Sequence, residues 1–593
     1  MRRRILGIAI VFLFTACGGS GGDQEGSQKK AEGPVNYGGV FKLNEVEDFD
    51  DLYPLNITDA VSNRIASQVY EGLVEVSQDT LKIQPALAKS WEIKDSATRY
   101  VFHLREDVKF HKNKCFDKGS ERKLTAKDVK YCFDKLCSSS PRNQLFWLFK
   151  NKVKGANKYF KSTEKGKPLK NGVPGIRVKG KHTIELKLNY PYKGFLKILA
   201  HAGCFIYPKK AFDHYQKKFR VNPVGTGPFK MQRVEKGVSV VLKRNGEYWD
   251  KDQYGNKLPY LDGIKITFKK EKTQELTAFH NDNLDMVYRL PVASIDKITE
   301  DLEQAKKKKK KELPFKLQDK PSMAVQYYGF QHKSDLFSSK HLRKAFNYAI
   351  NREKLTKFTL EGEGIPAHNG IIPPSFENYP SDKVKGYSLN VKKAKEHLKK
   401  ARGHLKELGY KNGELPTINL YLNSGGSKNV VVAEAIQNMW NKHLGIQVQL
   451  NEMPLSQLLE KMEKGKAGIF RTGWIADYPD PENFLNLFYG KHVPESMDER
   501  SSINKTRYDS AKFDSLFAKG LRTLDNKKRM KLFRLAEQEA MDDAAVIPLF
   551  YDENMRLIKP DVRNFPMNPM ERRDFTRVYF AKEKKKEEEK KES

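Results

Sequence analysis

The amino-acid sequence predicts a mixed α/β fold with mixed sheets, divided among several domains or lobes. Strand-like runs alternate with helical patterns throughout the chain, without a short repeat. The amphipathic helix predicted over Val430–Leu444 is followed directly by the strand-like run Gly445–Leu450, which together form an α/β building block. The chain has 593 residues, of which 38% are hydrophobic. That length and composition support folded cores in about four domains, or in two or three large lobes.

The predicted elements follow in chain order. Apolar and polar residues alternate, as in strands, in three runs: Tyr100–Arg105, Thr183–Asn189 and Ser239–Lys243. A helix is predicted from Thr125 to Phe133, because Thr125 is a good N-cap and Asp128 lies in the first turn. Helical spacing recurs in three later segments: Lys340–Leu360, Val391–Leu408 and Lys527–Met541. The last of these precedes the apolar strand Val546–Tyr551.

The N-terminus has the pattern of an export signal. Met1–Arg4 is basic, and Ile5–Phe14 is an apolar run of ten residues, too short to span a bilayer as a mature helix. Small residues then precede Cys17, which resembles the lipobox of bacterial lipoproteins, although Phe14 stands where a Leu is usual. The resemblance implies a signal peptide over residues 1–16 and a lipidated Cys17. An ordinary secretory signal with an incidental Cys is the alternative.

Three polar segments are predicted to lie outside the folded cores. Residues 17–33, rich in Gly and polar side chains, are predicted to be a flexible tether that carries a body starting near Pro34. Lys306–Lys311 and the mixed-charge tail over residues 582–593 are expected to be solvated. For the lysine run, contact with a membrane surface or an anionic partner is the alternative.

The charge balance narrows the class of protein. Lys and Arg number 109 and Asp and Glu number 74, a net charge of +35. Such a surplus suits nucleic acid or an anionic membrane. The export signal, and basic residues that are not interleaved with aromatic ones on one element, argue against nucleic acid. A mean hydropathy of −0.70 excludes a polytopic membrane protein.

Four cysteines remain beyond Cys17: Cys115, Cys132, Cys137 and Cys204. An even number in an oxidising compartment allows two disulfides with three possible pairings, and buried free thiols are the alternative. No CxxC pair occurs, which argues against a zinc or redox site.

Enzyme signatures are not found. The sequence has no GxxxxGK[ST], HExxH or GxSxG motif, and its thirteen His residues lack metal-ligand spacing. Gly225–Pro228 (GTGP) is similar to a phosphate loop, but Pro228 lacks an N–H and no P-loop Lys follows. We expect it to be a tight turn in which the glycines permit positive φ. The sequence thus predicts a protein that is not an enzyme and has no metal or cofactor.

Nine segments, in order along nearly the whole mature chain, carry a resemblance to a known family. They are VYEGLVEV from Val69, Pro85–Ile93, Tyr100–His111, Leu124–Leu136, Asn222–Met231, Arg244–Asp250, Leu342–Leu355, Gly473–Leu485 and Val546–Tyr551. In this order they resemble the family 5 extracytoplasmic solute-binding proteins, which are the peptide, dipeptide and nickel receptors of ABC importers.

The resemblance implies two lobes around a ligand cleft, with a smaller extra domain, and a hinge motion that closes the cleft. Carried onto this chain it implies the following parts: lobe I over residues 34–73, 174–289 and 554–581, the extra domain over 74–173, and lobe II over 290–553.

The sharpest implied site lies in Phe470–Pro481. An Asp three residues after the Trp pairs with the peptide α-ammonium in the peptide-binding branch, and here that residue is Asp477. A cation enclosed in a water-poor cleft needs such a partner. The same branch hydrogen-bonds the peptide main chain with the strand that here is Gly473-Trp474-Ile475, as an added strand would be bound. Arg471 matches an Arg that helps to bind ligand carboxylates.

Each of these residues has a structural alternative. Asp477 can serve an Asx-turn before Pro479, Trp474 can pack in the core, and Arg471 can belong to a structural ion pair. Weaker candidates follow from the same resemblance. Asp59 is predicted to assist with the amine, and Trp147, beside Phe146, to offer the cleft an aromatic ring from the extra domain. Lys428 and Asn429 stand where some receptors meet the peptide C-terminus, without the His found there.

The sequence therefore predicts a monomeric receptor, lipid-anchored outside the cytoplasmic membrane, that binds oligopeptides and delivers them to an ABC permease. The same fold binding another solute, such as a nickel chelate, haem or an oligosaccharide, is one alternative. A surface lipoprotein acting as an adhesin or chaperone is the other.

Overall fold

The computed structural model describes residues 29–117, 122–308, 314–424 and 427–581. Outside them lie the following predicted features: the signal peptide, Cys17, most of the tether, the second half of the lysine run and the charged tail. The body begins earlier than predicted. β1 (Lys29–Lys30) pairs with β2 (Asn36–Tyr37), and Glu32 exchanges backbone hydrogen bonds of 3.0 and 2.8 Å with the Asn256 side chain. The prediction of a tether up to residue 33 is therefore wrong at its C-terminal end.

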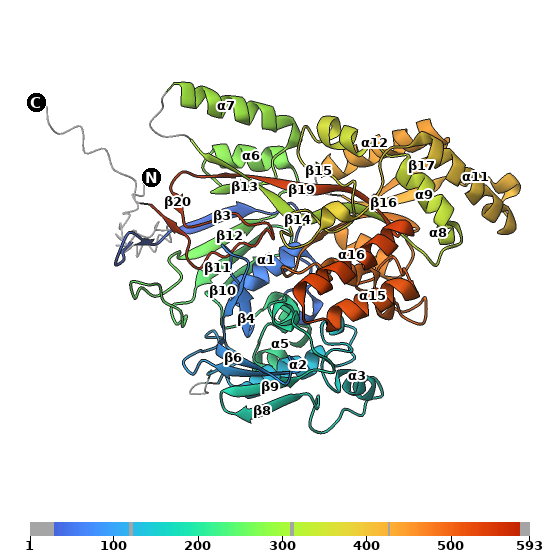
Figure 1. The fold of residues 1–593 in the computed structure, drawn as a ribbon. Helices are drawn as coiled ribbons and strands as arrows, with labels where there is room; N and C mark the ends of the chain where they lie inside the picture. Colours follow the sequence, from blue (N-terminus) through green and yellow to red (C-terminus); the bar gives the residue numbers. More distant parts are fainter. Residues whose placement is uncertain (1–28, 118–121, 309–313, 425–426, 582–593) are drawn as a thin grey trace, which may run out of the picture.

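Lobe I is built on a four-stranded sheet of the described chain. Its order is β10 (Phe229–Glu235), β11 (Ser239–Arg244), β12 (Gly263–Thr267) and β3 (Val40–Asn44), with β12 and β3 parallel. The strand predicted over Ser239–Lys243 is confirmed. Helix α1 (Ala60–Val69) packs against β10 and directs its N-terminus toward lobe II (Figure 1).

The extra domain lies at the bottom of Figure 1. Its antiparallel sheet has the order β6 (Ala88–Lys94), β7 (Arg99–Leu104), β9 (Thr183–Lys187) and β8 (Ile176–Gly180). Helices α2 (Ala126–Leu136) and α3 (Ala156–Glu164) accompany it. The predicted boundary after residue 173 is wrong, because β8 and β9 complete the sheet begun by β6 and β7. The strands predicted over Tyr100–Arg105 and Thr183–Asn189 are confirmed as β7 and β9, and the helix predicted at Thr125 is confirmed as α2.

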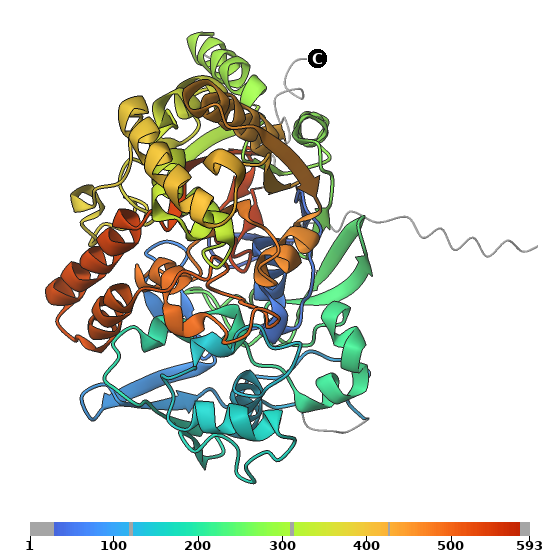
Figure 2. The same cartoon turned by 90° about the vertical axis from the view of Figure 1, so that its right-hand side faces the viewer.

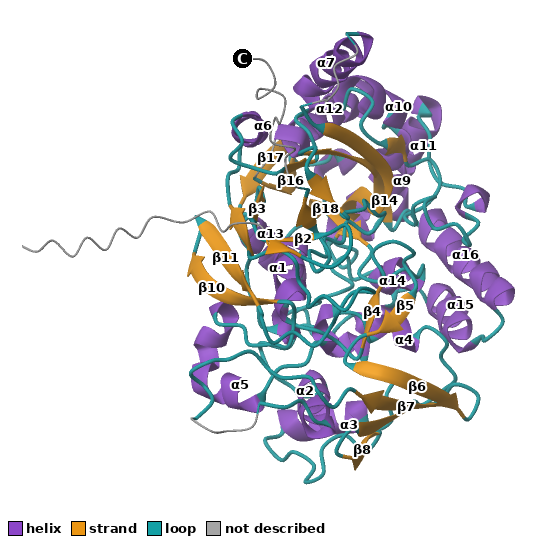
Figure 3. Ribbon diagram, turned by 90° about the vertical axis from the view of Figure 1, so that its left-hand side faces the viewer, coloured by secondary structure: helices purple, strands orange, loops and turns teal. Residues whose placement is uncertain are grey.

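Lobe II is organised by a seven-stranded sheet of the described chain, which Figure 3 shows curving in its upper half. Its path is β13 (Met286–Tyr288), β19 (Val546–Ile558), β14 (Lys316–Phe330), β18 (Ile469–Ile475), β16 (Ile418–Asn423) and β17 (Val448–Met453), with β15 (Ile365–Pro366) on β19. The predicted boundary between residues 553 and 554 falls inside β19, whose pairing with β14 continues to Ile558. That boundary is therefore also wrong.

Helices cover both faces of this sheet and extend beside it (Figures 2 and 3). Their bounds are α6 (Lys272–His280), α7 (Ile295–Lys307), α8 (Asp335–Ser338), α9 (Lys340–Tyr348), α10 (Arg352–Lys354), α11 (Val391–Glu407), α12 (Ser427–Leu444), α13 (Leu455–Glu463), α15 (Ala511–Arg522) and α16 (Asn526–Asp542). The predicted helix over Lys340–Leu360 is broken. It ends at Tyr348, and Asn351 leaves helical geometry to cap a new turn by accepting from the Lys354 N–H.

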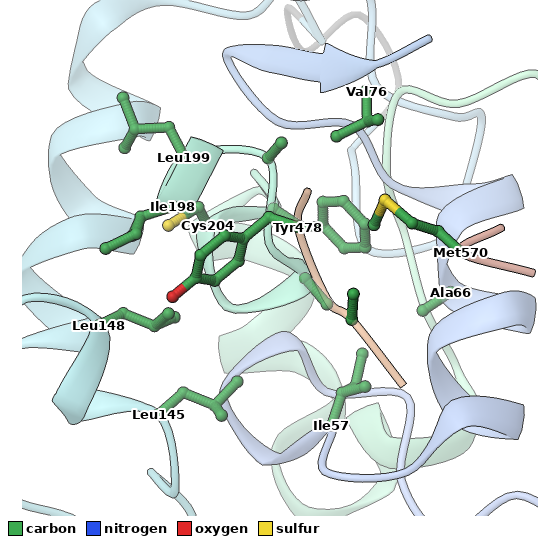
Figure 4. Packing of buried hydrophobic residues seen from close by; sticks show 14 of the residues in the cluster. Ile57, Ala66, Val76, Leu145, Leu148, Ile198, Leu199, Cys204, Tyr478 and Met570 are labelled. Carbon is green, nitrogen blue, oxygen red and sulfur yellow. The ribbon is translucent and has the colours of Figure 1, made fainter. Parts of the chain in front are cut away.

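One hydrophobic cluster connects the three parts. Figure 4 shows Tyr478, from the segment after β18, among residues of the extra domain and lobe I, including Leu148, Ile198 and Ile57. Tyr478 is fully buried, and its hydroxyl donates to Glu482 at 2.5 Å. Burial of a large aromatic ring in the opposing part fixes the segment that follows β18.

All four cysteines of the described residues are buried, and none forms a disulfide. The structure thus decides for free thiols over the paired alternative.

The GTGP turn also differs from its prediction. Gly225 and Gly227 do not have positive φ. A Cβ at Gly225 would lie 2.1 Å from the Val69 carbonyl oxygen, so close backbone approach, and not a left-handed conformation, requires glycine.

Candidate functional site

A cavity of about 470 Å³ lies between lobe I, the extra domain and lobe II. Its walls include the N-terminal end of α1, Trp147 and His201 on one side, and β18 and α12 on the other. The volume is within the range of sites that enclose small ligands. Every residue predicted for the ligand site lines it: Arg471, Gly473, Trp474, Ile475, Asp477, Asp59 and Trp147.

The backbone of β18 offers an unpaired edge to this cavity. β18 pairs with β14 along its whole length, from Ile469 to Ile475. On its other side the described part of β16 pairs only with Ile469 and Phe470. The remaining residues of β18 have no strand partner on that side within the described chain, so this edge can pair with an extended chain. At Gly473 a Cβ would lie 2.7 Å from Gln326 Oε1, so glycine lets Gln326 pack across this strand.

Asp477 lies at the end of this edge, just beyond β18. Its Oδ2 accepts from Asn483 Nδ2 at 3.0 Å and lies 3.7 Å from His201 Nε2. The side chain keeps 26% of its surface exposed. The Asp477 carboxylate therefore faces the cavity, held by a neutral amide instead of by a guanidinium. The other carboxylate oxygen, Oδ1, accepts no hydrogen bond from the described residues and can face a cation.

Trp474 is both packed and exposed to the cavity. Its Nε1 donates to Asn483 Oδ1 at 2.8 Å, and its ring contacts the large hydrophobic cluster. The alternatives of core packing and ligand contact are thus not exclusive for this residue.

Arg471 brings a positive charge to the cavity. Nη1 donates to Asn423 Oδ1 at 2.9 Å, and Nη2 donates to Gln326 Oε1. Among the described residues it has no carboxylate within 4.0 Å, so the alternative of a structural ion pair is not what the structure has. Burial lowers the pKa of Arg471 to about 10, because the guanidinium is only partly compensated, chiefly by the charge of Asp552. An anionic ligand group would supply the missing charge.

Asp59 and Trp147 have structural partners as well as a place in the wall. Asp59 caps α1, accepting from the Ser62 N–H at 2.8 Å and from Ser62 Oγ at 2.5 Å, and burial raises its pKa. Trp147 is 6% exposed and meets the His201 ring edge-on. Their roles toward a ligand stay predictions.

Lys428 also lines the cavity, in an ion pair of 3.3 Å with Glu363 that the sequence did not indicate.

Hydrogen bonds also join the parts of the molecule near the end of β18, outside the cavity lining. Lys197, on α4 (Phe195–Ile198), donates to the Pro479 carbonyl and to Asp480 Oδ2, both at 2.9 Å. Asp480 also binds Arg529 of α16 with two hydrogen bonds of 2.7 and 3.0 Å. Burial by itself would raise the pKa of Asp480, but Arg529 and Lys197 hold it well below its usual range. We call Lys197, Asp480 and Arg529 together the latch.

Sequence reasoning missed His201, Asn483 and the latch. Asn483 had no distinguishing signal, since Glu482 and Asn486 are polar residues in the same short run after Pro481. The other contacts join segments far apart in the sequence and left no local pattern.

No three His, Cys, Asp or Glu side chains of the described residues are grouped so that they could hold a metal ion. None of the helices in the described ranges has the length and apolar character needed to cross a membrane.

Comparisons with known proteins agree with this geometry. The family model described as bacterial extracellular solute-binding proteins, family 5 (middle), matches residues 82–494. The oligopeptide-binding protein OppA of Bacillus subtilis is 28% identical over 578 residues, covering 94% of this chain and 97% of that protein. Heme-binding protein A of Haemophilus influenzae is 26% identical over 516 residues, 86% of each chain. The periplasmic binding protein DppA of Helicobacter pylori, solved with the peptide STSA, has a TM-score of 0.78 at 24% identity and covers 92% of this chain and 99% of its own.

Proposed function

Because the chain belongs to the bacterial extracellular solute-binding proteins of family 5, we propose that it is the peptide receptor of an ABC importer. It binds oligopeptides in the cavity between its lobes and delivers them to the permease. No covalent chemistry is involved, and the mechanism is affinity coupled to closure. Ligand drives closure only if it binds the closed state better than the open one.

The observation that carries this proposal is the unpaired edge of β18 beside Asp477. Main-chain groups of Gly473, Trp474 and Ile475 on the cavity side lack a strand partner in the described chain. Pairing with this edge reads the peptide backbone and is indifferent to side-chain identity. Asp477 then supplies the negative charge for the α-ammonium, and Arg471 the positive charge for a carboxylate. A sugar or a metal chelate would leave the edge unused.

Haem is the competing solute, because heme-binding protein A is about as similar to this chain as the peptide-binding relatives. The cavity wall includes His201, whose Nε2 faces Asp477 and whose Nδ1 accepts from the Gly203 N–H at 3.0 Å. The experiment below therefore includes haem as a ligand.

The direct test is the identity of the retained ligand. We expect mass spectrometry of the freshly purified, denatured protein to release mixed short peptides. Calorimetric titration should then give tight binding of a tetrapeptide with a free amine and much weaker binding of its N-acetyl form, with no binding of haem or oligosaccharides. Release of haem or sugar alone, or no binding of any peptide, would reject the proposal. An empty cleft with a protein partner would favour the adhesin or chaperone alternative.

The proposed anchor is a lipid on Cys17, which places the receptor on the outer side of a membrane. One acyl chain anchors only marginally, so two or three are needed for stable attachment. Mass spectrometry of the mature N-terminus should find a diacylglycerol-modified Cys17. Cys17→Ser should release the protein from membranes without changing its peptide affinity. A membrane-bound Cys17→Ser protein would contradict this part of the proposal.

A further inference from the structure

Asn483 is a buried amide whose side-chain hydrogen bonds go to the proposed amine site. It lies in α14 (Glu482–Leu485), the short helix that follows Asp477, and is 0% exposed. Its Oδ1 accepts from Trp474 Nε1 at 2.8 Å and from the Asp477 N–H at 3.1 Å. Its Nδ2 donates to Asp477 Oδ2 at 3.0 Å. Because one end of the amide faces two N–H donors and the other end faces a carboxylate acceptor, the first end must be the oxygen and the second the nitrogen.

These bonds fix Asp477 before a ligand arrives. One carboxylate oxygen is held by Asn483 Nδ2 and the backbone of the same residue is held by Asn483 Oδ1, so the side chain has little rotational freedom left. A group that is already oriented loses less entropy when it binds a cation. The same oxygen of Asn483 holds the Trp474 indole, so one amide sets the relative position of the two side chains.

The backbone of Asn483 is in turn hydrogen-bonded to Asp480. Its N–H donates to the Asp480 carbonyl at 3.0 Å, and the Asp480 carboxylate binds Arg529 on α16. Both residues of that ion pair are buried. The support therefore runs from a long helix of lobe II to Asn483 and from there to the cavity wall.

From this geometry we infer that Asn483 is the positioning residue for recognition of the ligand's amino group. It does not line the cavity and acts through Asp477 and Trp474. The inference rests on the proposed function and deepens it, because it says why one carboxylate in the cleft is oriented to take an ammonium group.

The test is a double-mutant cycle of Asn483→Leu and Asp477→Asn, read by calorimetric titration with a tetrapeptide and with its N-acetyl form. Leu has about the size of Asn but neither its donor nor its acceptor. In the wild-type background we expect Asn483→Leu to weaken binding of the free-amine peptide by about tenfold to a hundredfold. The acetylated peptide should lose less than about threefold, as should the free-amine peptide in the Asp477→Asn background.

Asn486 provides a matched control. It is also a buried Asn in the same segment, but its Nδ2 donates to the Glu482 carbonyl and carboxylate, at 3.0 and 2.7 Å, and it touches neither Trp474 nor Asp477. Asn486→Leu should leave the ratio of the two peptide affinities unchanged. If Asn483→Leu does not fold, Asn483→Ser, which leaves room for water, takes its place with the same expectations.

Each outcome is decisive. Equal losses for both peptides, equal losses in both backgrounds, or the same pattern in Asn486→Leu would show that Asn483 is only structural and overturn the inference, while the proposed function stands. A wild-type protein that binds peptides without preferring a free amine would overturn both the inference and the amine site. A selective loss that disappears in the Asp477→Asn background supports it.

Discussion

We expect Glu537 to link the stability of lobe II to pH. It lies on α16, the helix that also carries Arg529, and is fully buried. Its Oε1 accepts from the N–H groups of Ile371 and Ile372 at 2.7 and 2.9 Å, and its Oε2 accepts from the Tyr379 hydroxyl. None of the ion pairs found among the described residues includes it. Burial raises the pKa of Glu537 from 4.5 to about 7, against the effect of these three hydrogen bonds.

The sign and size of the effect follow from linkage. The folded state binds the Glu537 proton more tightly than the unfolded chain does, so its contribution to stability is complete below about pH 4.5 and is lost as the pH rises through about 7. A shift of about 2.5 pH units at about 1.4 kcal/mol per unit gives about 3 kcal/mol for the whole range.

Glu537→Gln removes this dependence at little steric cost. The amide oxygen can accept from both N–H groups, the amide nitrogen can donate to the Tyr379 oxygen, and the side chain is neutral at every pH. Relative to wild type, the variant should therefore gain about 3 kcal/mol of unfolding free energy between about pH 4.5 and pH 8. Other carboxyls with raised pKa values, such as Glu71 at about 8 and Glu75 at about 7, are common to both proteins and cancel in this difference.

The assay is scanning calorimetry of both proteins at several pH values. A multidomain chain need not unfold in one step, so the two are compared at each pH and not by a single free energy. The variant should melt near wild type in acid and clearly above it in weak base. A difference in melting temperature that is the same at both ends of the range would refute the reasoning.

Three further predictions concern the site and its support. Asp477→Asn should cost free-amine peptides about 2–4 kcal/mol of binding free energy and N-acetyl peptides much less, measured by calorimetric titration; equal costs would mean that Asp477 does not hold the amine. Lys197→Met removes the two lobe-bridging hydrogen bonds but keeps the aliphatic stem, so peptide affinity should fall by up to about tenfold and small-angle scattering should show a more open molecule, with Asp480 still paired within lobe II. An unchanged affinity would argue against the latch. Gly225→Ala should destabilise the protein by about 1–3 kcal/mol, because its Cβ would meet the Val69 carbonyl, whereas Gly246→Ala, with nothing within 4 Å, should melt like wild type.

Local sequence patterns predicted helices and strands correctly where the signal lies within the element itself, such as a cap or a hydrophobic period. The capping pair of Thr125 and Asp128 defines the start of α2, where the Asp128 carboxylate accepts from the Thr125 N–H at 2.9 Å. Periodicity placed α11, α16 and the strands β7, β9 and β11 within a few residues. Periodicity failed at Asn351, because the Asn351 side chain caps a new turn and so ends the preceding helix. Hydrophobic spacing does not show whether a side chain will cap in this way.

Domain boundaries could not be read in the same way. β8 and β9 belong with β6 and β7, and β19 continues past residue 553, because strand partners are chosen by edges that come together only in the folded chain. The cysteines are a similar case. Their number allowed disulfides, but all four thiols are buried and free, which only the folded chain decides.

For the candidate site, the sequence by itself determined which residues to predict: an Arg, a Gly and a Trp on β18 and an acid just beyond it, from Arg471 to Asp477. This was possible because they lie within a single short segment. Only the tertiary structure decided that the edge of β18 beyond Phe470 has no strand partner in the described chain, that Asn483 hydrogen-bonds Asp477, and that Lys197 reaches Asp480 from 283 residues away. The physical reason is that burial, edge pairing and the compensation of charge are properties of neighbours in space, and a linear chain does not record them.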